Sequence, residues 1–232
     1  MKKIPFLFLI LAAALLSDPA AAQEIKHYAD TPEDLLPYGQ FMDPYLLFFD
    51  EPLPYRGPGR DGEASANLES VKIGFVAPLE GSYDDLYGKA MLEGAEMAIE
   101  EANSRGGYRG IPYELIVKND VGLWGSTGNE VVDLYDEGVW AVVGSIDGNN
   151  SHVALRVVLK LGLPMVNTSS TDPTLTETRI PWMIRNVADD RQNAYAMARH
   201  IFEKEGLENV AIFRANDRYG RLGVKIFLES AI

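Results

Sequence analysis

The 232-residue chain contains no cysteine, so it cannot form disulfide bonds, hold a metal ion through thiolates or use a thiol nucleophile. Histidine is scarce: His27, His152 and His200 stand apart, and none has a second histidine at the spacing of metal ligands. No serine lies in a Gly-x-Ser-x-Gly turn, and no nucleophile–base pair is visible. We therefore expect no metal, no cofactor and no catalytic residues, and hence a protein that is not an enzyme.

Basic residues are also few. The chain has 21 Lys and Arg against 34 Asp and Glu, which gives a formal net charge of −13 at pH 7. A surface of that sign repels both the phosphates of nucleic acids and anionic lipid headgroups. We therefore expect neither nucleic acid nor an anionic membrane as a partner.

The sequence has one long apolar run, at residues 4–16. This run follows Lys2 and Lys3 and precedes a segment of small residues that ends at Ala22. The run is too short for a membrane-spanning helix, which needs about 20 apolar residues. A basic start, a short apolar run and small residues form the pattern of a secretory signal peptide. The pattern predicts a signal peptide over residues 1–22, cleavage after Ala22, a periplasmic location and no membrane insertion once the signal is removed.

Residues 23–70 form an acidic leader that keeps no helical or strand period. This segment contains ten acidic residues against three basic ones, and six prolines that interrupt regular structure. Its charge and proline content are typical of a disordered segment. It is nevertheless rich in aromatic residues: Tyr38, Phe41, Tyr45, Phe48, Phe49 and Tyr55. Two interpretations stay open, a segment that docks on this protein or a partner and a loose spacer.

From residue 71 the chain alternates between short apolar segments and amphipathic ones. Strands are expected over 71–79, 113–118, 140–143, 163–167 and 182–185, and helices over 87–104, 127–137 and 150–161. Alternation with short turns predicts an α/β fold with a doubly wound parallel sheet. The strands are continuously apolar, which favours burial on both faces. We expect residues 71–188 to form one α/β ligand-binding lobe.

Residues 189–232 begin a second pattern of the same kind. A helix is expected over 191–205, a strand over 210–213 and another helix from residue 219, in which the sequence stops. So short a segment cannot bury a core of its own. We therefore expect residues 189–232 to be the start of an incomplete second α/β lobe.

Three turns of the expected sheet are unusually polar: residues 80–88, 144–151 and 168–173. Each follows a strand and leads into a helix, and in an open parallel sheet ligands bind beyond the carboxyl ends of the strands. The free N–H groups at the start of each helix attract an anion. Ser, Thr, Asn and Asp are also ordinary helix caps, so any single turn has a second, purely structural interpretation. Three such turns at one edge favour a site for a small solute with a carboxylate.

Several motifs in chain order carry a family resemblance: 78–81 (Pro-Leu-Glu-Gly), 103–110 (Asn-x-x-Gly-Gly-x-x-Gly), 162–166, 168–176 and 216–220. With these motifs, residues 71–232 resemble the leucine/isoleucine/valine-binding protein family. The resemblance implies the type I periplasmic-binding fold, in which two lobes close on a ligand by a hinge motion. It also implies a small, amino-acid-like ligand, which the protein delivers to an ABC permease.

The resemblance further implies which residues touch the ligand. Ser169, Ser170 and Thr171 would hold the α-carboxylate and ammonium groups of an amino acid. Tyr87 would lie over the ligand, and Tyr219 would contact it from the second lobe.

One turn departs from the family pattern. The family usually supplies a serine hydroxyl where this chain has Gly148, flanked by Asp147 and Asn149. Asn149 and Asn150 are candidates to replace that hydroxyl, whereas a buried Asp147 would favour a cationic group or repel a carboxylate. The expected ligand is therefore a small polar solute, with an amino acid as the main candidate.

Two functions agree with these expectations. The first is the solute-binding component of an ABC importer, and the alternative is a ligand-sensing domain of a regulator or receptor with the same fold. Neighbouring permease and ATPase genes would favour the first, and a neighbouring kinase or antiterminator gene would favour the second.

Overall fold

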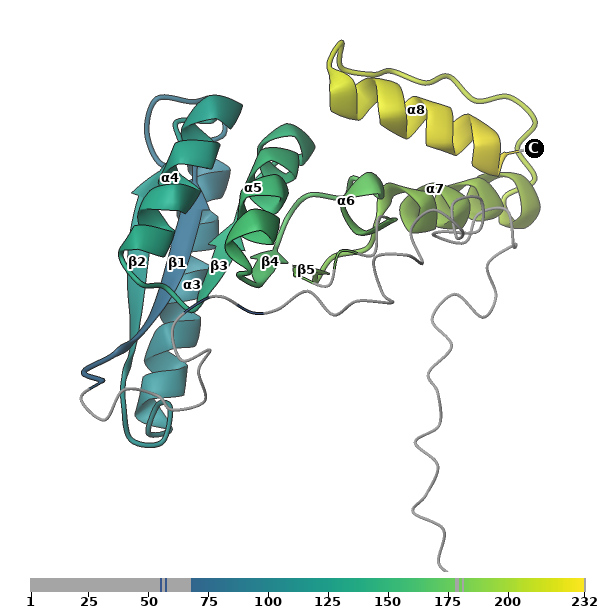
Figure 1. Ribbon diagram of the computed structural model, residues 1–232. Coiled ribbons are helices and arrows are strands. Elements are labelled where there is room, and N and C mark those ends of the chain that lie inside the picture. The colour runs from purple at the N-terminus through teal and green to yellow at the C-terminus, as the bar shows by residue number, and fades with distance from the viewer. Residues whose placement is uncertain (1–54, 56, 58–67, 178–179, 181, 232) are drawn as a thin grey trace, which may run out of the picture. The chain divides into compact units, whose positions relative to one another are not determined.

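The computed structural model describes residues 55, 57, 68–177, 180 and 182–231 (Figure 1). The expected signal peptide, residues 1–22, and most of the 23–70 leader lie outside the described residues.

Five parallel strands form a single sheet in the order β2-β1-β3-β4-β5. Their bounds are Val71–Ala77 (β1), Tyr113–Asn119 (β2), Ala141–Gly144 (β3), Met165–Asn167 (β4) and Met183–Arg185 (β5). The predicted doubly wound α/β sheet is confirmed. Because β2 lies on one side of β1 and β3 on the other, the strand order reverses here, and the loops after β1 and β3 diverge to leave a crevice.

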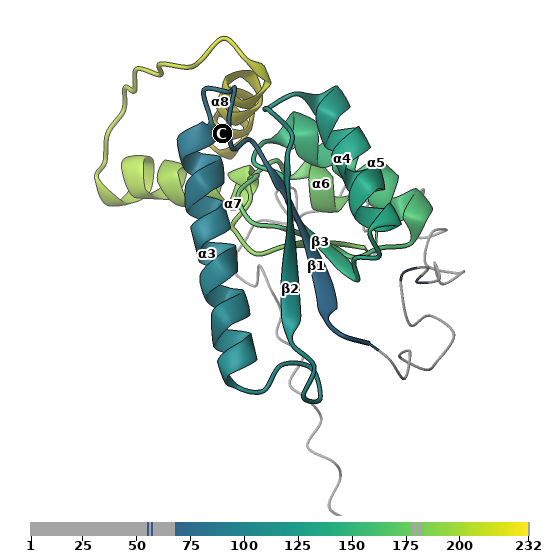
Figure 2. The same ribbon diagram turned by 90° about the vertical axis from the view of Figure 1, so that its left-hand side faces the viewer.

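Three helices connect the first four strands: α3 (Asp85–Ser104), α4 (Trp124–Asp136) and α5 (Gly148–Leu161). Figure 2 shows α3 on one face of the sheet and α4 and α5 on the other. All three begin two or three residues before the predicted positions. A short helix that the sequence did not predict, α6 (Thr174–Glu177), lies between β4 and β5.

The core lies between the sheet and the helices α4 and α5. Val142 and Met165 are paired in register, and both are fully buried with Leu134 of α4 and Val158 of α5. This continuous apolar contact is the main source of stability in a domain of this kind.

The opposite face of β3, β4 and β5 is covered less than the sequence predicted. Val143, Val166 and Ile184 are neighbours in register there; the first two are half-buried, and Ile184 is 54% exposed. Among the described residues the helix on this face is α3, and it packs against β1 and β2. Burial on both faces is therefore complete only near β1.

At the amino end of the sheet, one leader residue packs against the core. The Tyr55 hydroxyl donates a hydrogen bond to the Trp140 carbonyl (3.3 Å), and the Tyr55 ring lies 6.3 Å from that of Trp182. Gly57 is buried beside them, where a Cβ would lie 2.7 Å from the Leu163 side chain. At this point the leader contacts the protein itself.

After β5 the chain forms α7 (Asp190–Ala198), a π-helical segment, η2 (Arg199–Lys204), and α8 (Arg218–Ser230). A capping box between Asp189 and Gln192 starts α7. The predicted helix over 191–205 thus forms in two parts, and the predicted helix from residue 219 begins one residue earlier. Phe202 of η2 and Phe227 of α8 lie 6.4 Å apart, and α7 also packs against α8.

The predicted strand over 210–213 is wrong. These residues are irregular, and Phe213 is 95% exposed. A strand needs a partner for its backbone N–H and C=O groups. The described residues offer this segment none, since β5 ends the described sheet and pairs with β4.

Candidate ligand-binding site

A cavity of about 710 Å³ opens at the carboxyl ends of β1, β3 and β4. Its lining comes from four segments far apart in the sequence: Asp84, Tyr87, Ala90 and Met91 at the start of α3, Ile146 to Gly148 after β3, Ser169 to Thr171 after β4, and Tyr219 of α8. Its volume is in the range typical of small-molecule sites. The three polar turns predicted from the sequence therefore meet at one edge of the sheet.

Six of the seven predicted ligand residues line this cavity: Tyr87, Gly148, Ser169, Ser170, Thr171 and Tyr219. The seventh, Asn149, lines a second cavity of about 620 Å³, together with Trp124, His152, Arg156 and Arg218. Gly148 and Asn149 both belong to the first turn of α5, and consecutive helical residues point in different directions. The structure thus places Asn149 away from the predicted site, in a different cavity from Ser169.

The loop after β3 is fixed by Asp147, which caps α5. Its carboxylate accepts the backbone N–H of Asn150 at 2.8 Å. Burial raises the pKa of the Asp147 carboxyl, and the neighbouring carboxylates of Asp120 and Asp84 raise it further, against the effect of backbone hydrogen bonds from Asn150 and Asn149. The negative charge of Asp147 is therefore costly where it lies.

Beneath the cavity, the fully buried Asp120 joins four segments. Its Oδ2 accepts hydrogen bonds from Thr127 Oγ1 (2.8 Å), Ser145 Oγ (3.0 Å) and Asn150 Nδ2 (3.3 Å). Its Oδ1 accepts the backbone N–H of Gly122 at 3.0 Å. Asp120 thus ties the end of β2 to α4, to the loop after β3 and to α5.

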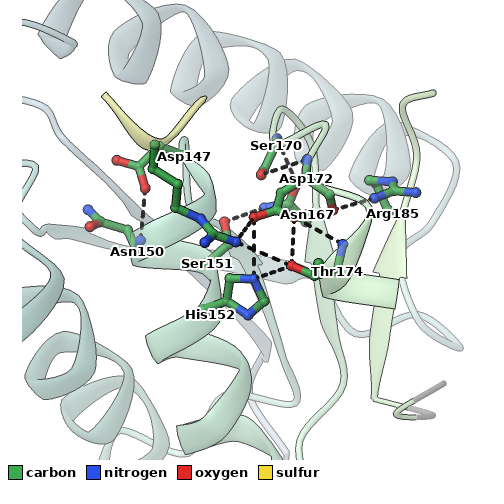
Figure 3. A network of polar contacts seen from close by, with 10 residues as sticks. Asp147, Asn150, Ser151, His152, Asn167, Ser170, Asp172, Thr174 and Arg185 are labelled. Carbon is green, nitrogen blue, oxygen red and sulfur yellow. Dashed lines mark hydrogen bonds and ion pairs between the residues drawn. The ribbon is translucent and has the colours of Figure 1, made fainter. Parts of the chain in front are cut away.

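Asn167, the last residue of β4, performs a similar role for the next loop. It is fully buried, and its Nδ2 donates to the carbonyl of Ser145 at 2.9 Å. Its Nδ2 also donates to Ser151 Oγ (2.8 Å), and its Oδ1 accepts the backbone N–H of Ser170 (2.8 Å) (Figure 3). Sequence reasoning did not identify Asn167. The available signal was a polar residue at the end of an otherwise apolar strand.

The Ser169–Ser170–Thr171 loop is held by its own polar groups. The Ser169 hydroxyl donates to the Ile146 carbonyl at 2.5 Å, which links it directly to the loop after β3. The Thr171 carbonyl accepts the backbone N–H of Asp190 at 2.8 Å, which links it to the start of α7. The loop is therefore fixed by contacts within the protein, a preorganisation that lowers the cost of binding at a small-molecule site.

Next to this loop, the Asp172 carboxylate contacts three polar side chains. Arg218 Nη2 donates to Asp172 Oδ2 (2.6 Å), Thr174 Oγ1 donates to Oδ1 (2.6 Å), and His152 Nε2 lies 3.4 Å from Oδ2 (Figure 3). Burial alone would raise the pKa of the Asp172 carboxyl, but the hydrogen bonds from His152, Thr174 and Arg218 hold it well below its usual range. Because Arg218 precedes Tyr219, this ion pair places Tyr219 at the cavity.

The described residues contain no group of three His, Asp or Glu side chains that could hold a metal ion. No helix in this part of the chain is both long and apolar enough to cross a lipid bilayer.

The cavity at the carboxyl ends of the strands offers hydroxyl groups, backbone groups, two tyrosines and two carboxylates. This set of groups is suited to holding a small polar molecule.

An open parallel sheet with a small-molecule cavity at the point where its strand order reverses defines an α/β ligand-binding unit. Residues 70–231 match the family model described as Periplasmic binding protein. The chain belongs to this family. The resemblance to leucine/isoleucine/valine-binding proteins predicted from the motifs is confirmed by the curated relatives and solved structures that follow.

The Leu/Ile/Val-binding protein homolog 3 of Brucella melitensis is 29% identical over 160 residues, which cover 69% of this chain and 43% of that protein. The ABC transporter substrate-binding protein of Desulfitobacterium hafniense, in a complex with Leu, is 29% identical with a TM-score of 0.62, over 70% of this chain and 47% of that one. Glutamate receptor 3.4 of Arabidopsis thaliana is 26% identical over 160 residues, 68% of this chain and 16% of the receptor. The chain thus spans less than half the length of the relatives it matches.

Proposed function

We propose that this protein is the solute-binding component of an ABC importer and captures an amino acid or a similar small polar solute. The observation that carries the proposal is the shared cavity, in which Tyr87, Gly148, Ser169 to Thr171 and Tyr219 meet although they are far apart in the sequence. The Brucella relative is named for Leu, Ile and Val, and the Desulfitobacterium structure holds Leu. Both names support a ligand of this class.

The cavity suggests how the solute is held. A carboxylate would lie against the Ser169 to Thr171 loop, which lines the cavity and offers hydroxyl and backbone groups. Tyr87 and Tyr219 are 63% and 66% exposed, so much of their ring surface is available to cover a ligand. An opposing lobe that closes over the cavity would bury both rings with the solute. The protein would bind and release its ligand unchanged.

The location and partner follow from the same proposal. A signal peptide over residues 1–22, cleaved after Ala22, would deliver the protein to the periplasm, in agreement with its family. An ABC permease in the inner membrane would receive the ligand there. Residues 189–232 would form the start of the second lobe, joined to the first through β5 and α7.

A second function is a ligand-sensing domain of a receptor, which the match to the glutamate receptor favours. The match covers a small share of that receptor, so the importer function has the broader support. Deletion of the gene distinguishes the two. Loss of uptake of a radiolabelled ligand supports the importer, whereas unchanged uptake with a lost transcriptional or signalling response supports the sensor.

The binding proposal is tested by calorimetry on the natural gene product, titrated with the common amino acids and small carboxylates. We expect at least one to bind, and we expect Tyr87→Ala to weaken that binding about tenfold or more, because a central tyrosine of a small site contributes much of its affinity. Tyr83→Ala is the matched control, since Tyr83 lies four residues away, is fully exposed and does not line the cavity. Absence of heat with every compound would sink the proposal.

A further inference from the structure

The charged side chains that line the ligand cavity are both acidic. They are Asp84 and Asp147, and no arginine, lysine or histidine lines the cavity within the described residues. The cationic side chains nearby lie on the other side of the first turn of α5, where His152, Arg156 and Arg218 line the second cavity. The first turn of α5 therefore separates an acidic cavity from a basic one.

The nearest arginine is not available to neutralise the acidic cavity. Arg218 adjoins Tyr219 in the sequence, but its Nη2 is bound to Asp172 Oδ2 at 2.6 Å. Arg185 is likewise paired, with Asp189 at 3.1 Å. In the described part of the chain no ion pair to Asp84 or Asp147 is present, so a positive charge beside them would be supplied by a ligand or by the opposing lobe.

The cap of α5 does not require a negative charge at residue 147. Asp147 accepts the N–H groups of Asn150 and Asn149, and serine or asparagine performs this role about equally well. Burial and the nearby carboxylates disfavour its ionised form. A carboxylate at this site is thus unfavourable for the empty protein, and it becomes favourable when a cation occupies the cavity.

Two further features, one in the cavity and one beside it, suit a cation. Tyr87 and Tyr219 both line it, and aromatic faces attract ammonium and amidinium groups. Behind the Ser169 to Thr171 loop lies Asp190, which is 7% exposed and whose Oδ2 has no hydrogen-bond partner among the described residues. Asp190 lines an adjoining cavity that also contains Tyr219.

We propose that the ligand carries a net positive charge, with an ammonium or amidinium group beside Asp147, and that Asp147 is the residue that selects it. Basic amino acids and small diamines are the substrate class. This inference rests on the proposed solute-binding function and names the class of solute for the same site.

The test compares ligands of matched shape. The natural gene product is titrated by calorimetry with three pairs of amino acids: lysine and norleucine, ornithine and norvaline, and arginine and citrulline. Each pair differs mainly in one positive charge. We expect the cationic member of at least one pair to bind about tenfold to a hundredfold more tightly, as one charge-assisted hydrogen bond allows. Equal or tighter binding of the neutral members overturns the inference and leaves the binding function intact.

The role of Asp147 is tested with Asp147→Asn, which keeps the helix cap and removes the charge. We expect the variant to lose the preference for the cationic member of the pair while its affinity for the neutral member stays the same or improves. Asp217→Asn is the matched control, because Asp217 caps α8 in the same way, accepting the N–H of Gly220 at 2.7 Å, and does not line the cavity. An equal loss for both members would mean that Asp147 acts only as a cap, which overturns the inference. If no solute binds at all, the proposed function fails with it.

Discussion

The two ends of the five-stranded sheet are built from different kinds of residues. At the carboxyl end, the buried Asp120 and Asn167 join the loops through hydrogen bonds. At the amino end, Tyr55 packs against Trp182 and the apolar core with one hydrogen bond, 3.3 Å long. Asn103 also forms hydrogen bonds to the backbone at the partly buried start of β2. Hydrogen bonds depend on direction, whereas apolar packing depends mainly on the area removed from water. The end that carries the candidate site is therefore held mainly by buried hydrogen bonds, and the other end mainly by apolar packing.

The largest effect is expected at the carboxyl end. Asp120→Ala removes the acceptor of three side-chain donors, Thr127, Ser145 and Asn150. Ser145 and Asn150 lose their side-chain acceptor in a buried position, while Thr127 keeps the Leu123 carbonyl at 3.2 Å. Each unsatisfied buried group costs roughly 1–3 kcal/mol, so we expect a loss of about 3–5 kcal/mol in the free energy of unfolding. Urea unfolding followed by circular dichroism measures the loss.

Asp136→Ala is the control for this variant, because Asp136 ends α4 at an exposed position. Its free energy of unfolding should stay within about 0.5 kcal/mol of the wild type. A loss below about 1 kcal/mol for Asp120→Ala would show that this end depends on packing as the other end does.

A smaller effect is expected at the amino end. Tyr55→Ala removes a partly buried ring from the core and should cost about 1–3 kcal/mol, while Tyr55→Phe, which removes only the long hydrogen bond, should cost less than about 1 kcal/mol. Neither variant should change ligand affinity, because Tyr55 lies at the end of the sheet opposite the cavity. A clear loss of affinity in calorimetry would show that the two ends are coupled.

The smallest effect on stability concerns the pair between Asp172 and Arg218. Arg218→Ala should cost less than about 1 kcal/mol at pH 7, since Asp172 keeps His152 and Thr174 as partners and Arg218 is partly exposed. The pKa of Asp172 lies below its ordinary 3.8, so the stabilisation is complete above about pH 4 and is lost as the pH falls through the lower, folded-state pKa. The difference between variant and wild type should therefore narrow only in strong acid.

Ligand affinity gives the second measurement on this pair. Arg218→Ala should also weaken binding, because the pair positions Tyr219 at the cavity. Lys225→Ala, at an exposed ion pair elsewhere on α8, should leave both stability and affinity unchanged. A stability difference that narrows already above about pH 4 would contradict an origin in the charge of Asp172.

Two segments with the same apolar, β-branched pattern show how far the sequence predicts the fold. Residues 140–143 and 210–213 were both predicted as strands, but only the first contributes to a strand, β3, which pairs with β1 and β4. The second is irregular, because no partner strand exists for it among the described residues. The pattern indicates that a segment can form a strand, and remote residues decide whether it does.

For the candidate site, the sequence predicted which loops meet but not the direction of every side chain. The carboxyl ends of parallel strands share one edge, so the meeting of Tyr87, Gly148 and the Ser169 to Thr171 loop followed from the strand assignments. The direction of Asn149 did not follow, because α5 begins at Gly148 and not at the predicted residue 150. The contacts of Asp120 were also beyond sequence reasoning, since Ser145 and Asn150 lie 25 and 30 residues away.

The side chains that hold the loops are largely separate from those that face the cavity. Asn167 binds the loop after β3, α5 and the backbone of Ser170, yet it does not line the cavity itself. We therefore expect substitutions at Tyr87, or of Asp147 by another capping residue, to change which solute fits while the hydrogen bonds of Asp120 and Asn167 remain. Because different residues hold the loops and line the cavity, a family with this arrangement can evolve new ligand preferences through a few substitutions in the cavity lining while the buried hydrogen bonds are conserved.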